Sequence, residues 1–71
     1  MTIACIIDTA TYDEVVAGTV TARVDSVAAG RVDFLIVAGR AEITGTEILA
    51  ADHAATLTEA MNAALAEFLA A

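Results

Sequence analysis

Residues 16–25 read Val-Ala-Gly-Thr-Val-Thr-Ala-Arg-Val-Asp, and this segment gives the clearest indication of the secondary structure. Alternation with a period of two is typical of a β-strand that has one face on a core and one face in water. One face would carry small or apolar residues and the other mainly polar ones: Val16, Gly18, Val20, Ala22 and Val24 against Thr19, Thr21, Arg23 and Asp25. The stretch therefore predicts a strand of an antiparallel sheet.

A second strand is expected from Arg31 onward, because the alternation resumes there. Its two faces would carry Val32, Phe34, Ile36 and Ala38 on one side and Asp33, Leu35 and Val37 on the other. Residues 26–30 would form a five-residue connection that closes at a glycine, a residue that adopts positive φ without strain.

A charge motif occurs three times, with an arginine followed two positions later by an acid. The pairs are Arg23 with Asp25, Arg31 with Asp33, and Arg40 with Glu42, and they contain every Lys or Arg of the protein. Opposite charges facing each other across two strands stabilise a sheet and like charges destabilise it. We therefore expect Asp25 to face Arg31 and Arg23 to face Asp33, and we interpret the arginines as locally neutralised rather than as an anion-binding stripe.

The remaining sheet is less regular in sequence. Residues 3–7 predict a short strand, buried on both faces and central in the sheet. Residues 8–14 predict a polar loop, and residues 39–42 a continuation of the second strand through a bulge or bend at Gly39. Residues 44–46 predict a turn, and residues 47–51 a short edge strand or, equally well for Ala and Leu, a helix.

The C-terminal residues predict one long amphipathic helix. Its start is expected at Asp52 as N-cap or, one turn later, at a capping box formed by Thr56 and Glu59. Apolar residues recur at steps of three and four: Ala54, Leu57, Met61, Ala64, Leu65 and Phe68. Residues 1–71 are thus expected to form a single α+β domain, in which an antiparallel sheet of three to four strands packs one C-terminal helix on one face.

A single helix leaves the other face of the sheet uncovered. Leu35 and Val37 are expected on that face, with Ile6 as a neighbour, and contiguous exposed apolar surface usually marks an interaction site. A chain of 71 residues is also close to the size at which domains need disulfides, metals or partners. We therefore expect self-association through these residues, most simply as a homodimer.

Composition limits the environment and the partners. A net charge of −7 disfavours direct binding to nucleic acid and favours a protein partner with a basic surface. No apolar stretch is long enough for a membrane span, no secretory signal is visible, and Cys5 is the only cysteine, so a cytoplasmic protein of the cell or of an infected host is expected.

Four residues of the polar segment are the candidates for partner binding: Asp8, Tyr12, Asp13 and Glu14. Tyrosine is a common interface anchor, although its ring could instead pack against the sheet edge. The acids lack the spacing of a calcium loop, so a metal is not expected. Cys5 and His53 are interpreted as a buried small residue and a surface residue near the helix start, rather than as a catalytic pair, and no cofactor is expected.

Three classes of function remain open. The first is a non-enzymatic module that binds a basic, nucleic-acid-binding protein as an inhibitor or modulator. In size and charge alone, with no shared motif, the chain is similar to phage-encoded anti-CRISPR proteins and DNA mimics. The second is a structural subunit that assembles with itself. The third is a small enzyme or ligand carrier whose site lies at a subunit interface.

Overall fold

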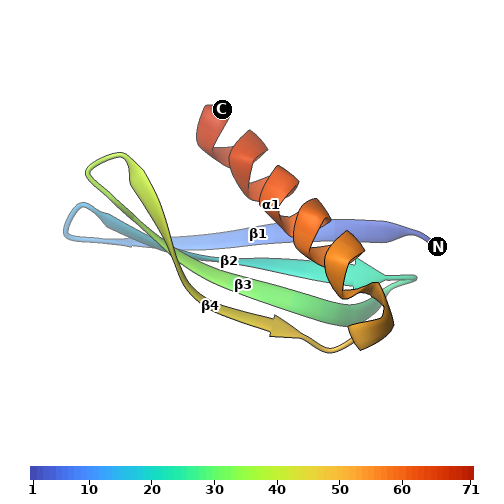
Figure 1. Cartoon of the computed structure of the whole chain (residues 1–71). Coiled ribbons are helices and arrows are strands. Elements are labelled where there is room, and N and C mark those ends of the chain that lie inside the picture. Colours follow the sequence, from blue (N-terminus) through green and yellow to red (C-terminus); the bar gives the residue numbers. More distant parts are fainter.

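The computed structural model describes all 71 residues as a four-stranded antiparallel sheet with one long helix (Figure 1). Neighbouring strands in sequence are neighbours in space, so the sheet order is β1-β2-β3-β4. The expected α+β architecture, with the C-terminal helix on one face of the sheet, is confirmed. The elements are β1 Ile3–Tyr12, β2 Val15–Val24, β3 Val27–Val37, β4 Arg40–Ile48, a 3₁₀ turn η1 Ala51–His53 and α1 Ala54–Ala70.

Each hairpin is closed by a turn of two residues that both have positive φ. The pairs are Asp13 and Glu14 (46° and 71°), Asp25 and Ser26 (49° and 71°), and Ala38 and Gly39 (53° and 78°). Positive φ at both positions is typical of type I′ turns, whose twist matches that of the flanking strands. Because each connection uses only two residues, almost all of residues 3–48 are left for the strands.

Several sequence-based boundaries are therefore wrong. The polar segment 8–14 is not a loop, because β1 continues through Tyr12, and β1 lies at an edge of the sheet rather than at its centre. The five-residue connection 26–30 is wrong, because β3 already begins at Val27. Residues 39–42 do not extend β3, since the chain turns at Gly39, and residues 44–46 lie inside β4 instead of forming a turn.

The expected register between β2 and β3 is also wrong. Thr21 faces Arg31 and Thr19 faces Asp33, whereas Arg23 faces Ala28. A register shift between Ala22 and Arg23 separates the pairs of Thr19 and Thr21 from the pair of Arg23. The expected register, with Asp25 opposite Arg31, would place Val20 opposite Ile36, but Val20 lies opposite Val32, four positions away. Because this displacement is even, the paired residues from Val16 to Ala22 keep their predicted faces.

The core lies between α1 and the face of the sheet that it covers. Phe34 is fully enclosed and contacts Phe68 of the helix, with ring centroids 6.2 Å apart. The buried apolar residues are Val20, Ala22, Ala29, Val32, Phe34, Leu57, Met61 and Leu65. The predicted apolar stripe of the helix is confirmed by Leu57, Met61 and Leu65, which recur every four residues.

The helix begins between its two expected starts, one residue later than an Asp52 N-cap would place it and before Thr56. Asp52 lies in η1 and provides no side-chain cap, while His53 occupies the N-cap position, also without a side-chain hydrogen bond. Thr56 and Glu59 lie within α1 and so form no capping box at its start. The segment 47–51 is neither a separate strand nor a helix. Its first two residues, Glu47 and Ile48, end β4, and its last residue, Ala51, begins η1.

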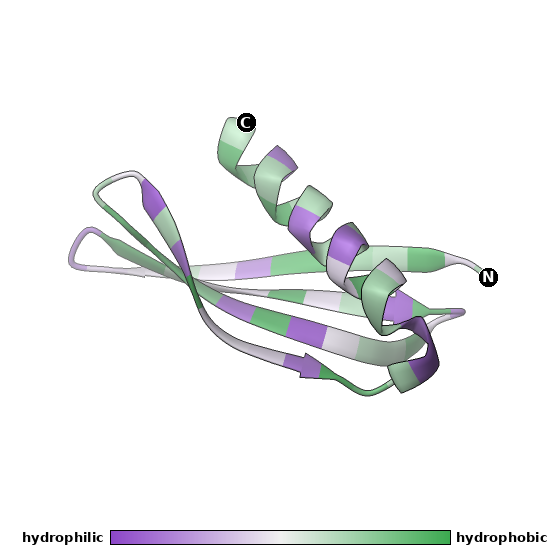
Figure 2. Cartoon of the chain, in the orientation of Figure 1, coloured by the Kyte–Doolittle hydropathy of each residue, from purple (hydrophilic) through white to green (hydrophobic).

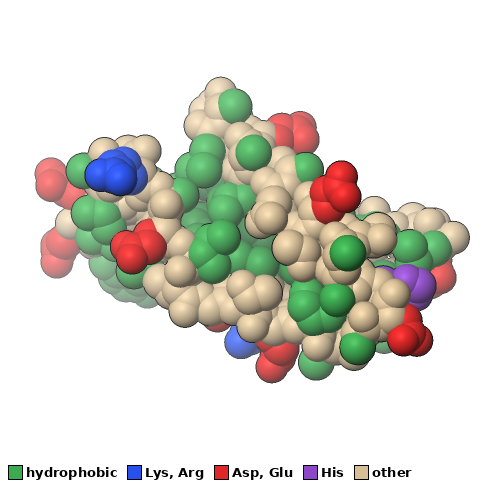
Figure 3. All heavy atoms as spheres, viewed as in Figure 1, with side chains coloured by type: hydrophobic (Ala, Val, Ile, Leu, Met, Phe, Trp, Pro, Cys, Tyr) green, Lys and Arg blue, Asp and Glu red, His purple; other side chains and the backbone are tan.

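The helix covers only part of its own face of the sheet. The ends of both outer hairpins project beyond it (Figure 1), within a molecule whose principal extents are 38 × 21 × 18 Å. Figure 3 shows hydrophobic side chains in the hollow between the helix and these hairpin ends. Ile43 lies in this outer part of the sheet and is exposed.

No helix of the protein has the length and apolar character needed to cross a membrane.

Candidate functional site

The sheet face opposite the helix carries most of the residues singled out from the sequence. Strand pairing places Leu35 beside Ala17, and Val37 beside Arg40, on this uncovered face. Val37 is 48% exposed and Ile6 is 46% exposed. All three residues expected to mediate self-association therefore lie on the uncovered face, as the alternation predicted.

A row of polar residues on neighbouring strands, Asp8, Thr19 and Asp33, separates Ile6 from Leu35 and Val37. We call it the polar row. Ile6 pairs with Thr21, four positions along β2 from the Ala17 that pairs with Leu35, which corresponds to about 13 Å in a strand. Thr19 lies between these positions and faces both Asp8 and Asp33. The apolar patch expected from the sequence is thus divided into two parts.

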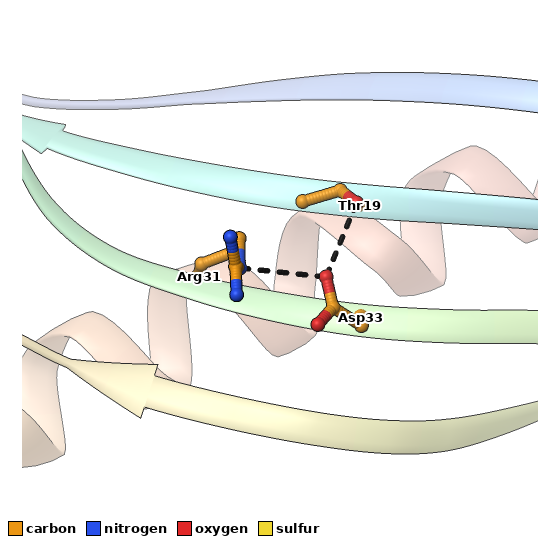
Figure 4. A network of polar contacts seen from close by, with 3 residues as sticks. All are labelled: Thr19, Arg31 and Asp33. Atoms are coloured by element: carbon orange, nitrogen blue, oxygen red, sulfur yellow. Dashed lines mark hydrogen bonds and ion pairs between the residues drawn. The ribbon is translucent and has the colours of Figure 1, made fainter.

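Thr19 and Asp33 of the polar row form the one side-chain network of the sheet together with Arg31. Figure 4 shows this network from the side opposite the helix. The Thr19 hydroxyl donates a hydrogen bond to Asp33 Oδ1 at 3.2 Å, and Arg31 Nε lies 3.5 Å from the same oxygen. Both members of the ion pair are about half exposed, so the pair contributes little to stability. Local neutralisation is therefore observed for Arg31 but not for Arg23 or Arg40, which make no ion pair.

A hollow of about 440 Å³ opens beside this network. Asp8 and Asp33 flank it, and its floor includes the apolar side chains of Ala17 and Leu35. Its lining is Asp8, Thr9, Ala10, Ala17, Gly18, Thr19, Asp33, Phe34, Leu35 and Thr44. Such a surface suits the side chain of a lysine or arginine, whose apolar stem can lie on the floor while its charge meets Asp8 and Oδ2 of Asp33, the oxygen not bound by Thr19 and Arg31.

The four partner-binding candidates are split between two places. Tyr12, Asp13 and Glu14 meet at the tip of the β1–β2 hairpin, and Tyr12 is 69% exposed, so its ring does not pack on the sheet edge. Asp8 lies four residues back along β1, at the hollow. The signal that could have separated them was present in residues 9–12, since Thr and Tyr favour strands.

Cys5 and His53 do not form a pair. Cys5 lies beside Ala64 in the C-terminal half of α1, whereas His53 is the N-cap of that helix, eleven residues before Ala64, or roughly 16 Å along the helix. Burial raises the pKa of the Cys5 thiol, which keeps it protonated and poorly nucleophilic near neutral pH.

A second hollow, which the sequence did not reveal, lies between β1 and the end of α1. It has a volume of about 340 Å³ and is lined by Cys5, Ile7, Ala64, Glu67, Phe68 and Ala71. It depends on the position of β1 at an edge of the sheet, which the sequence did not predict. We call it the β1–α1 groove.

Comparison with models of known protein families, with curated proteins and with solved structures gave no match.

Proposed function

We propose that this protein is a small acidic, non-enzymatic binding module that engages a basic surface of another protein, as an inhibitor or modulator. The observation that carries the proposal is the hollow on the uncovered face, in which Asp8 and Asp33 flank an apolar floor. Nucleic-acid-binding proteins present lysines and arginines to phosphate groups. A protein site that normally receives phosphates is therefore the natural target of these two carboxylates. The cytoplasm, of the cell or of an infected host, is the proposed location.

Long-range electrostatics support the same partner. The net charge of −7 would attract a basic protein and accelerate its association, while salt would screen the attraction. The carboxylates would set the orientation, and burial of Leu35 and Val37 beside the hollow would add the non-directional part of the affinity. Binding is therefore expected to be fast and sensitive to salt.

Capture of proteins by the immobilised chain tests the proposal. Proteins retained at about 50 mM salt should be basic and nucleic-acid-binding, and they should be released at about 500 mM salt, where the Debye length is much shorter. Duplex DNA should compete for them, because it would occupy the same basic site.

A matched pair of variants locates the effect. The double variant Asp8→Asn with Asp33→Asn should lose most of the captured proteins, since it removes both carboxylates of the hollow. The double variant Asp52→Asn with Glu59→Gln changes the net charge equally on η1 and α1 and should retain them. Equal capture by the two variants, or capture unaffected by salt, would contradict the proposal.

A structural subunit that assembles with itself is the second candidate. It is favoured by the apolar residues that the single chain leaves exposed on both sides of the sheet, among them Val37 and Ile43. Native mass spectrometry of the purified protein distinguishes the two. A closed assembly larger than a dimer, formed without any partner, would favour the structural function, and a monomer or homodimer would favour the binding module.

A further inference from the structure

The two edges of the sheet are built differently. The β4 edge carries Arg40, Glu42 and Glu47, and its pairing with β3 is interrupted by a register shift next to Phe34. Charges and bulges are the usual devices that prevent another strand from adding to an edge. β1 is less protected: its ten residues pair with β2 in one unbroken register, and it carries a single charged residue, Asp8.

Backbone groups of β1 face outward along this edge. The Asp25 N–H donates to the Thr2 carbonyl oxygen at 2.9 Å, which makes the even-numbered residues of β1 the ones that bond to β2. The N–H and C=O groups of the odd-numbered residues therefore point away from the sheet. These residues are Ile3, Cys5, Ile7, Thr9 and Thr11.

The β1–α1 groove runs beside the outward-facing backbone. Residues of an added strand that hydrogen-bond to Cys5 and Ile7 would share their face of the sheet and point into this groove. Phe68 forms part of its wall and is 38% exposed. The first half of β1 is also the more hydrophobic half (Figure 2). The groove therefore suits apolar side chains at alternate positions of an added strand.

Charge decides what kind of strand would fit. Glu67 lines the groove and Asp8 lies on the opposite face of β1, while no lysine or arginine occurs on either β1 or α1. A second copy of the chain would bring its own Asp8 and Glu67 and a further charge of −7 to this edge. A basic segment would instead meet opposite charges on both faces.

We propose that the edge of β1 accepts an extended, basic segment of the partner protein as a fifth strand. Alternate apolar side chains of the segment enter the β1–α1 groove, and lysines or arginines between them lie near Asp8, with another near Glu67. Strand addition of this type derives affinity from backbone hydrogen bonds and specificity from alternate side chains. The inference rests on the proposed function and names a surface that the partner uses.

The acetylated and amidated peptide Arg-Val-Lys-Val-Thr-Lys-Arg is the probe, since its second lysine shares the face of the two valines and can reach Glu67. The acidic control is Glu-Val-Glu-Val-Thr-Glu-Glu. Amide exchange and chemical shifts are followed by NMR on the whole chain. The basic peptide should slow exchange at the outward-facing amides of Cys5, Ile7 and Thr9 and shift the resonances of Ala64 and Phe68. The acidic peptide should do neither, because Asp8 and Glu67 would repel it.

Two pairs of variants separate edge binding from general attraction. Thr9→Pro removes an outward-facing N–H and should weaken peptide binding about tenfold, whereas Ala41→Pro, at an outward-facing position of β4, should leave it within about twofold. Glu67→Lys should weaken binding, whereas Glu59→Lys makes the same charge change on α1 outside the groove and should not. The second pair keeps the test decisive if a proline variant fails to fold.

Three results would overturn the inference by assigning the binding elsewhere. They are protection of β4 amides instead of β1, equal effects of Glu67→Lys and Glu59→Lys, and concentration-dependent protection of β1 without peptide, which would assign the edge to a second copy. A basic peptide that shifts only residues around Asp33 would refute the edge and leave the proposed function intact. Absence of peptide binding would refute the edge alone, because protein capture tests the proposed function separately.

Discussion

The ring of Phe34 on β3 lies over the backbone of Gly18 on β2, so closely that a Cβ at position 18 would collide with it. Substitution Gly18→Ala forces the buried ring to move and should lower the free energy of unfolding by about 1–3 kcal/mol. Gly45→Ala is the matched control, because its Cβ would meet only Asp33 Oδ2, at an ordinary distance of 3.5 Å. Urea denaturation measures both, and equal losses would contradict this account.

The faces of β2 and β3 were predictable because a period of two survives any even shift of register. Val20 and Val32 lie on the helix-covered face and Thr19 and Asp33 on the other, as the alternation indicated. The register itself was not predictable from charge. A facing ion pair is worth only about 0.2–1 kcal/mol, less than the fit of Phe34 over Gly18.

The turns escaped prediction because their residues are unusual for the geometry. Type I′ turns are usually recognised as Asn-Gly or Asp-Gly, whereas these use Asp-Glu, Asp-Ser and Ala-Gly. Misplacing the first turn made a loop of residues 8–14, which grouped Asp8 with the hairpin tip and hid its position at the hollow. The candidate site depended on that boundary and was therefore only partly predicted.

The turn at Ala38 offers a route to higher stability. Ala38 adopts φ 53°, a left-handed conformation that costs an L-residue about 1–2 kcal/mol and that asparagine tolerates better. Ala38→Asn should raise the free energy of unfolding by about 0.5–1 kcal/mol, because it completes the favoured Asn-Gly turn with Gly39. Ala41→Asn, in the extended part of β4, should bring no gain. An equal change in both variants would contradict the explanation.

Asp25 hydrogen-bonds to the backbone of Thr2, next to the start of β1, and does not pair with an arginine. Its Oδ1 accepts a hydrogen bond from the Thr2 N–H at 2.9 Å, and its own N–H donates to the Thr2 carbonyl oxygen. Asp25→Ala loses the side-chain acceptor and places alanine at φ 49°, so unfolding should become easier by about 1 kcal/mol. Asp25→Asn keeps an acceptor and tolerates this φ, and its stability should stay close to that of the parent chain in urea denaturation.

Cys5 should make stability depend on alkaline pH. Burial raises the pKa of its thiol above the ordinary value of 9.0, so the folded chain holds this proton more tightly than the unfolded chain. The corresponding stability is complete below pH 9.0, the unfolded value, and is lost as the pH rises through the folded pKa. Urea denaturation at stepwise higher pH should show this decline. Cys5→Val retains an apolar side chain without a titrating group and should remove this part of the decline; an unchanged profile would mean that another group causes it.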